Sequence, residues 1–174
     1  MDTRLLLYIN EGHTPALDSV MWWISNKYIW IPLYAMLAFV TVKKLGRQSI
    51  PLLLLVAVLI LISDQLASGI LKTTVQRLRP SHDPIVQHML HYINNYRGGL
   101  YGFVSSHSMN AFALSFYFLF TIGRKIRWIS FVLFPWAVLV AYSRVYLGVH
   151  YPSDVIVSIL LSCPIAYGVS RLNK

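Results

Sequence analysis

Long apolar runs alternate with short basic segments along most of this chain. The runs cover residues 28–42, 50–71, 107–122, 128–143 and 152–170. A transmembrane helix needs about 20 predominantly apolar residues, and only closed backbone structures such as helices cross a bilayer in runs of this kind. The first run needs some of the preceding residues to complete a span. The pattern predicts an all-α membrane bundle of about five transmembrane helices.

The beginning of the chain has a different pattern. Residues 3–10 and 17–25 are amphipathic, rich in Trp and Tyr, and too short to cross about 30 Å of hydrocarbon. We expect helical segments that lie at the membrane interface. Residues 1–20 also carry Asp2, Glu11 and Asp18, so no cleavable signal peptide is expected and the first span would direct insertion. Residues 1–174 are expected to form a single membrane-embedded domain.

The composition supports a membrane protein and excludes a nucleic-acid-binding one. Of the 174 residues, 56% are hydrophobic and only 12% are charged, which is far more apolar than a soluble domain. The formal charge is +9, but the basic residues form short clusters and not one continuous polar face. Lipid phosphates and membrane orientation explain them better. The single cysteine, Cys163, lies in an apolar run and is expected to be inert packing.

The basic clusters predict the orientation of the chain. With five spans, the clusters at 43–47, 124–127 and the C-terminus fall on one side of the membrane, which should be cytoplasmic. The connection 72–104, the turn 144–151 and the N-terminus then share the opposite face. In a bacterium this is the periplasmic or outer side of the inner membrane.

Three of the basic residues on this outer face lie where the cytoplasmic bias does not account for them. Lys72, Arg79 and Arg144 lie at or beyond the ends of predicted spans. Each alone is typical of a cation that lifts its charge to the headgroups. Together they could hold an anion, because Arg binds phosphate through two hydrogen bonds and Lys supplies a point charge.

Two histidines accompany these cations. His150 and Asp154 are four residues apart and share a helix face, so the carboxylate could fix the imidazole tautomer and leave a nucleophile or base. The alternative is a capping Asp with an interfacial His. His107 follows Ser105 and Ser106 where a span begins, and a helix N-terminus favours anions. The alternative there is an N-cap Ser with an incidental His.

Asp64 is the acidic residue inside the second span. It is spaced at four-residue intervals from Ser68 and Lys72, which places all three on one stripe of an α-helix. An acidic residue in a span usually pairs with a cation or lines a polar cavity. We expect Asp64 to support Lys72 or Arg144.

The long connection carries three further histidines. No Cys or carboxylate accompanies them at a ligand spacing, so we expect solvated side chains or headgroup contacts, and no metal site. They are His82, His88 and His91.

The polar segments that begin at Lys72, Ser105 and Ser143 resemble the motifs of the type 2 phosphatidic acid phosphatase superfamily, the membrane relatives of the vanadium haloperoxidases. The family pattern is K-x6-R-P, then P-S-G-H, then S-R-x5-H-x3-D. Val104 and Ser106 replace the Pro and Gly of the middle motif. The residues that match are Lys72, Arg79, Pro80, Ser105, His107, Ser143, Arg144, His150 and Asp154.

The resemblance implies a role for each matched position. His150 would attack phosphorus and form a phosphohistidine, Asp154 would orient it, and His107 would act as general acid. No metal or other cofactor is implied. The phosphoryl oxygens would be bound by Lys72, Arg79, Arg144 and Ser105, with backbone N–H groups near Ser106 and His107.

The resemblance thus predicts an integral membrane lipid-phosphate phosphatase. Undecaprenyl diphosphate and phosphatidylglycerophosphate are favoured as substrates, with the lipid A phosphates and phosphatidic acid close behind. Specificity would lie in residues 81–103 and the N-terminal segment. Two other classes stay open: an enzyme of the same superfamily with a soluble substrate, and a non-catalytic lipid-binding or transport protein. The oligomeric state is left open.

Overall fold

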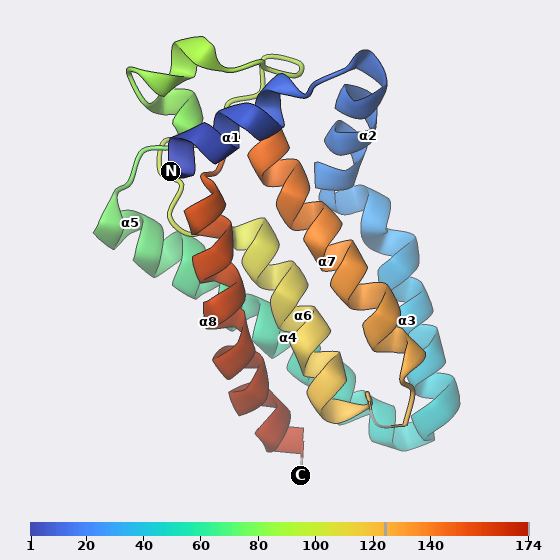
Figure 1. The fold of residues 1–174 in the computed structure, drawn as a ribbon. Coiled ribbons are helices and arrows are strands. Elements are labelled where there is room, and N and C mark those ends of the chain that lie inside the picture. Colours follow the sequence, from blue (N-terminus) through green and yellow to red (C-terminus); the bar gives the residue numbers. More distant parts are fainter. Residues whose placement is uncertain (124, 174) are drawn as a thin grey trace.

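The computed structural model of this chain describes residues 1–123 and 125–173, and the part that it describes is all-α (Figure 1). A segment of π-helix, Gln65–Leu71, joins two of the α-helices, and single turns of 3-10 helix cover Lys27–Trp30, Gly46–Gln48, Pro80–His82, Val86–Met89 and Arg171–Asn173. The α-helices are α1 (Asp2–Glu11), α2 (Pro15–Ser25), α3 (Ile31–Leu45), α4 (Ser49–Asp64), α5 (Lys72–Val75), α6 (Ser106–Thr121), α7 (Trp128–Tyr146) and α8 (Pro152–Ser170).

Helix α6 lies in the centre of the bundle, packed against α8, α7 and α4. Most of its side chains are buried, and two of them bind neighbouring backbones. The Tyr117 hydroxyl donates to the Leu52 carbonyl of α4 at 3.0 Å, and Ser115 Oγ donates to the Leu133 carbonyl of α7 at 3.1 Å. Because buried polar groups need partners, these contacts fix the position of α6 and of its N-terminus.

The outside of the bundle is apolar, as expected of a helical membrane protein. Phe39, Leu54, Phe131 and Leu160 are among the large hydrophobic side chains that are exposed. By length and composition, the stretches long and apolar enough to cross a membrane are Lys27–Val75, Trp128–Tyr146 and Pro152–Ser170.

The first of these stretches reverses direction part-way. Gly46 ends α3 with a φ of 56°, a conformation that glycine adopts without the steric cost of a Cβ. In Figure 1, α3 and α4 accordingly run in opposite directions from this turn. Helix α6, with 16 residues, is shorter than the length usually needed for a span. The chain is therefore a helical membrane protein.

Two boundaries differ from those predicted. Helix α7 continues to Tyr146, so Arg144 lies in its last turn and not in the predicted turn 144–151. The predicted second span 50–71 is not one regular α-helix, because α4 ends at Asp64 and the π-helix follows. The apolar pattern cannot predict the end of α7 or the change from α-helix to π-helix after Asp64, because the chain stays helical through both positions.

The two ends of the bundle carry different segments. In Figure 1 the turn after α3, the start of α7 and the end of α8 lie at one end. The N-terminal helices and the connection between α5 and α6 lie at the other. This arrangement agrees with the grouping of basic clusters inferred from the sequence.

Candidate active site

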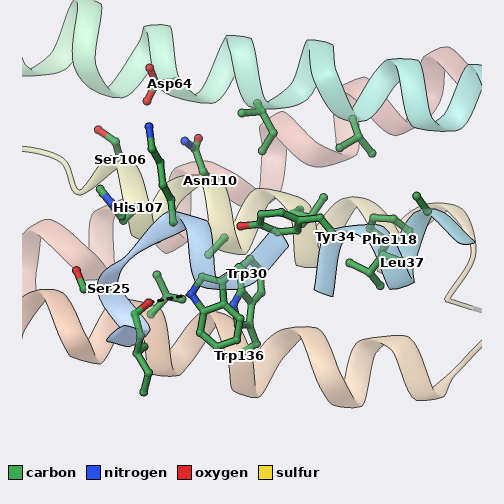
Figure 2. Close-up of a pocket in the computed structure, with 18 of the residues that line it drawn as sticks. Ser25, Trp30, Tyr34, Leu37, Asp64, Ser106, His107, Asn110, Phe118 and Trp136 are labelled. Atoms are coloured by element: carbon green, nitrogen blue, oxygen red, sulfur yellow. Dashed lines mark hydrogen bonds between the residues drawn. The ribbon is translucent and has the colours of Figure 1, made fainter. Parts of the chain in front are cut away.

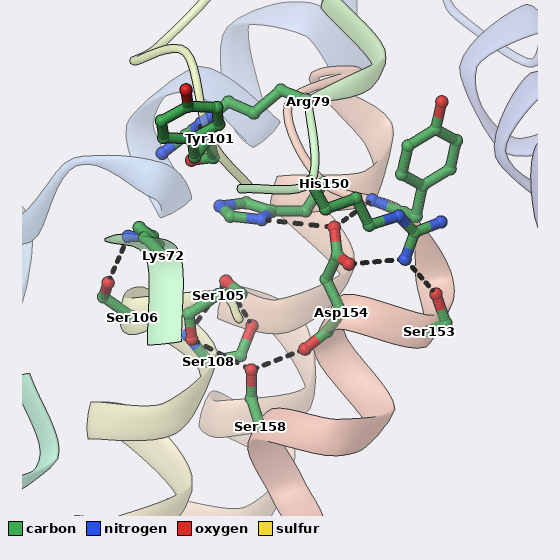
Figure 3. A network of polar contacts seen from close by, with 12 residues as sticks. Lys72, Arg79, Tyr101, Ser105, Ser106, Ser108, His150, Ser153, Asp154 and Ser158 are labelled. Atoms are coloured by element: carbon green, nitrogen blue, oxygen red, sulfur yellow. Dashed lines mark hydrogen bonds and ion pairs between the residues drawn. The ribbon is translucent and has the colours of Figure 1, made fainter. Parts of the chain in front are cut away.

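The loop between α7 and α8 brings His150 next to Asp154. Gly148 turns the chain with a φ of 67°, and Pro152 starts α8 at a position where its missing N–H costs nothing. Asp154 Oδ2 accepts a hydrogen bond from the Tyr151 N–H at 3.0 Å and lies 3.7 Å from His150 Nδ1 (Figure 3). Asp154 is thus a capping residue, but the interfacial histidine of the simpler interpretation is wrong, because His150 is 1% exposed.

Two arginines are buried beside this pair. Arg79 is 8% exposed and Arg144 is 2% exposed, so neither lifts its charge to the headgroups. Arg79 Nε donates to the Tyr101 carbonyl at 3.1 Å; Arg144 donates to Ser25 Oγ and, at 3.2 Å, to the Tyr96 hydroxyl. Within residues 1–123 and 125–173, Arg79 Nη1 and Arg144 Nε are buried and have no hydrogen-bond partner. Such donors fit the oxygens of an anion.

The long connection holds Arg79 in place through backbone pairing and small residues. The Arg79 N–H donates to the Leu100 carbonyl at 3.0 Å in an extended segment. A Cβ on Gly98 would lie 2.5 Å from Arg79 Nη1, and one on Gly102 would lie 3.1 Å from Arg79 Cγ and 3.3 Å from Asp154 Oδ2. These glycines let the connection pack directly against the guanidinium.

Lys72 meets the N-terminus of α6. Lys72 Nζ donates to Ser106 Oγ at 2.6 Å and to Ser68 Oγ at 3.4 Å (Figure 3). Ser105 caps α6, since its Oγ accepts hydrogen bonds from the N–H and the hydroxyl of Ser108 at 3.4 and 3.0 Å. The N-cap interpretation of Ser105 is therefore correct. Ser106, in place of the family glycine, supplies a partner for Lys72.

A cavity of about 560 Å³ begins at His107 and runs between α3, α4, α6 and α7 (Figure 2). Its walls are mostly apolar and aromatic, with Asp64 and Asn110 as polar residues near the His107 end. Ligand-binding cavities usually have about 300–1,000 Å³ and a lining of this type. The cavity is large enough for part of a lipid chain.

Comparison with known proteins assigns the family. The pattern that defines the PAP2 superfamily matches residues 52–174. The chain belongs to this superfamily. It is 36% identical to lipid A 4'-phosphatase of Bacteroides thetaiotaomicron over 92% of this chain and 72% of the relative. It is 34% identical to lipid A 4'-phosphatase of Porphyromonas gingivalis over 99% of this chain and 72% of the relative.

The fold is also found in a solved structure. The crystal structure of LpxE from Aquifex aeolicus superposes with a TM-score of 0.71 over 98% of this chain and 94% of that one, at 24% identity. The predicted family and the predicted membrane lipid phosphatase are confirmed.

Asp64 lies in the wall of the cavity in this PAP2 fold. The π-helix between Asp64 and Lys72 changes the register of the stripe on which the two residues were predicted to lie. Within the described part of the chain, Asp64 forms no ion pair and instead lines the cavity. Its support of Lys72 or Arg144 stays a prediction.

The electrostatic environment of His150 favours the neutral imidazole. Burial, followed by the positive charges of Arg79, Arg144 and Lys72, lowers the pKa of His150 well below its ordinary value. Only the unprotonated ring has a lone pair with which to attack phosphorus. At neutral pH the residue is thus in the form that a nucleophile requires.

Arg77 is a residue of the candidate site that the sequence did not predict. Arg77 Nη1 donates to Asp154 Oδ1 at 2.7 Å and to Ser153 Oγ at 2.7 Å, and Nη2 donates to Asp2 Oδ2 at 2.7 Å. Arg77 occupies a variable position of the first motif, two residues before Arg79. The one feature of the sequence that could have indicated it is a further positive charge on the predicted outer face, where the preference for basic residues in cytoplasmic loops does not explain it.

The histidines of the connection have different environments. His88 is exposed, as expected, whereas His91 Nε2 lies 2.8 Å from Asp18 Oδ2 and its ring packs 3.8 Å from that of His13. Across residues 1–123 and 125–173, no group of three His, Cys, Asp or Glu side chains could hold a metal ion. Cys163 is half-buried and free.

Proposed function

We propose that this PAP2 phosphatase removes a phosphate group from lipid A, with His150 as the nucleophile. The observation that carries the choice of substrate is the 36% and 34% identity to lipid A 4'-phosphatases over most of both chains. This favours the alternative given by the sequence analysis over undecaprenyl diphosphate and phosphatidylglycerophosphate, its first choices.

The first chemical step forms a phosphohistidine. The phosphoryl oxygens bind Arg79, Arg144 and Lys72, whose charges offset the negative charge that builds up in the transition state. His150 Nε2 attacks phosphorus, and the bond from phosphorus to the lipid oxygen breaks. The electron pair of that bond goes to the oxygen, which takes a proton from His107. His150 becomes cationic, and Asp154 accepts a hydrogen bond from its Nδ1–H.

The second step regenerates the enzyme. Water gives a proton to His107 and attacks phosphorus. The N–P bond breaks and its electron pair returns to His150 Nε2. The products are the dephosphorylated lipid and inorganic phosphate, and the charges of this chain's own side chains serve both steps without a metal ion.

The N-terminus of α6 and the cavity would hold the two ends of the substrate. The backbone N–H groups of Ser106 and His107, with Ser105 as the cap, lie where the helix dipole favours phosphoryl oxygens. An acyl chain fits the cavity that extends from His107 between α3, α4, α6 and α7. The oxygens of Asp64 and Asn110 are available there to polar groups of the lipid near its phosphate.

We infer five membrane spans, formed by α3, α4, α6, α7 and α8, with α1 and α2 at the interface. The basic turns at 43–47 and 125–127 would then be cytoplasmic. The active site would face the periplasm or exterior of a bacterial inner membrane, within one membrane-embedded domain of residues 1–174. The common placement of these turns at one end of the bundle supports this topology.

The experiment is a substrate panel with the detergent-purified protein and a chelator. Phosphate release is measured from lipid A, undecaprenyl diphosphate, phosphatidylglycerophosphate and phosphatidic acid. We expect the highest kcat/KM for lipid A and no turnover by His150→Ala. A tenfold preference for another lipid would overturn the substrate, and full activity of the variant would overturn the nucleophile.

A further inference from the structure

Arg77 joins Asp154, the carboxylate beside the candidate nucleophile His150, to Asp2 in the first turn of α1. The hydrogen bonds of its guanidinium within the described residues go to Asp154, Ser153 and Asp2. The same group lies over the Tyr151 ring, 4.1 Å from its centroid. None of these partners belongs to the set expected to bind phosphoryl oxygens, so Arg77 has a different role from Arg79.

The Asp154 carboxylate is held at both of its oxygens. Oδ1 accepts from Arg77 Nη1 at 2.7 Å, and Oδ2 accepts from the Tyr151 N–H at 3.0 Å. Oδ2 also lies 3.7 Å from His150 Nδ1, which has no hydrogen-bond partner within residues 1–123 and 125–173. The Asp154 side chain is 0% exposed, and a buried carboxylate is costly unless it is paired. Arg77 is the cation that pairs with it.

Arg77 is in turn held by the N-terminal helix. Asp2 Oδ2 accepts from Arg77 Nη2 at 2.7 Å and from Ser153 Oγ at 2.5 Å, and Asp2 Oδ1 accepts from the Ser153 N–H at 3.0 Å. Asp2 thus binds the start of α8 and the arginine together. Burial raises the pKa of Asp2, but the hydrogen bonds from Ser153 and Arg77 outweigh it, so the pKa is lowered and Asp2 is ionised at neutral pH.

The backbone also fixes where Arg77 can lie. Gln76 leaves α5 in a left-handed conformation with a φ of 52°, and the Arg77 carbonyl accepts from the Gly102 N–H at 2.8 Å. Arg77 and Arg79 are therefore in a short extended segment paired with the end of the connection. The segment supplies one arginine to Asp154 and the other to the neighbourhood of His150.

We propose that Arg77, braced by Asp2 of α1, is a positioning residue that fixes the Asp154 carboxylate for its contact with His150 during phosphoryl transfer. The inference rests on the proposed function of His150 as the nucleophile. When His150 takes the phosphoryl group it becomes cationic, and the contact of 3.7 Å has to shorten into a charge-assisted hydrogen bond. Because Arg77 holds Oδ1 of Asp154, Oδ2 already faces His150 Nδ1 and the carboxylate does not have to rotate before that bond forms.

Replacing the charge should separate this role from substrate binding. In Arg77→Gln we expect kcat to fall about 10–100-fold, as when the hydrogen-bond partner that orients a metal-ligating side chain is removed, with KM within about threefold. Loss of the Arg77 charge favours the protonated form of His150, so the acid limb of the pH profile of kcat/KM should move to higher pH. Arg77→Lys keeps the charge and should recover part of kcat.

The matched control is Arg47→Gln. Arg47 lies in the turn after α3, at the end of the bundle away from the candidate site, where it is exposed and pairs with no carboxylate in the described residues. We expect its kcat, KM and pH profile to match the wild type. Equal effects of Arg77→Gln and Arg47→Gln would overturn the proposal.

Asp2→Asn tests the bracing contact and covers the case in which Arg77→Gln does not fold. It should lower kcat less than Arg77→Gln does, and the double variant should be no slower than Arg77→Gln alone, because both changes act through one carboxylate. Additive losses, an unchanged kcat or a change in KM alone would refute the positioning role. A wild-type protein inactive on every lipid would refute the proposed function, whereas an active wild type with an unaffected Arg77→Gln refutes this inference only.

Discussion

Gly98→Ala should displace one phosphate ligand, Arg79, without replacing any side chain of the candidate site. The new Cβ would lie 2.5 Å from Arg79 Nη1 and 3.1 Å from Arg79 Cζ, so the guanidinium has to move away from its hydrogen bond to the Tyr101 carbonyl. A hydrogen bond to a charged group contributes about 1.5–3 kcal/mol. Since about 1.4 kcal/mol corresponds to a factor of ten, we expect kcat/KM to fall about 10–100-fold. The φ of +67° adds about 1–2 kcal/mol of backbone strain to the folded state.

The measurement is phosphate release at varied lipid concentration, with the unfolding midpoint as a check on folding. Gly99→Ala is the control, because no heavy atom lies within 4 Å of a Cβ at the adjacent position and the backbone there is not in the left-handed region. Its kcat/KM should stay within about twofold of the wild type, as for most surface substitutions. If Gly98→Ala keeps full kcat/KM while it lowers the unfolding midpoint, Arg79 does not bind the phosphate.

Three further predictions concern stability, substrate length and pH. Asn10→Ala removes three hydrogen bonds of a residue that is 1% exposed, so denaturation in detergent should show a free energy of unfolding lower by about 2–4 kcal/mol; an unchanged value would contradict this. Ala38→Phe narrows the cavity and should lower kcat/KM for long-chain but not for short-chain lipid phosphates. Ala35→Phe, at an exposed position of the same helix, should change kcat/KM for neither substrate. Equal losses of kcat/KM on long-chain and short-chain substrates in Ala38→Phe would refute the cavity as the acyl-chain site. Arg144→Gln removes a cation that lowers the pKa of His150, so the acid limb of kcat/KM should move to higher pH, and a shift to lower pH would contradict the assignment.

The sequence was sufficient for most of the candidate site because its residues occur at short, fixed spacings. His150 and Asp154 are four residues apart across the start of α8, so the spacing predicted the contact, and the turn at Gly148 and the Tyr151 N–H bond to Asp154 complete it at 3.7 Å. The apolar runs likewise predicted the helices to within a few residues. Arg79 and Arg144 were correctly expected near each other, but their burial could not be read from the sequence, because a span end permits both a buried and an exposed cation.

The remaining features depend on contacts between distant segments. Asp2 and Arg77 are 75 residues apart, and no periodicity links an interfacial helix to a variable motif position. The π-helix between Asp64 and Lys72 could not be foreseen for a related reason, since it changes the residue spacing along a face without changing the apolar composition. Tyr96 and Ser25, which bind Arg144, also come from segments that the sequence suggested only as possible specificity elements.

Trapping the phosphoenzyme tests the central claim most directly. The purified protein is mixed with a lipid substrate labelled in its phosphate, quenched within one turnover and digested for peptide mapping. We predict an acid-labile, base-stable label on the peptide that contains His150, and loss of this label in His150→Ala. A label on another residue, or turnover with no labelled protein at any time point, would contradict the phosphohistidine mechanism.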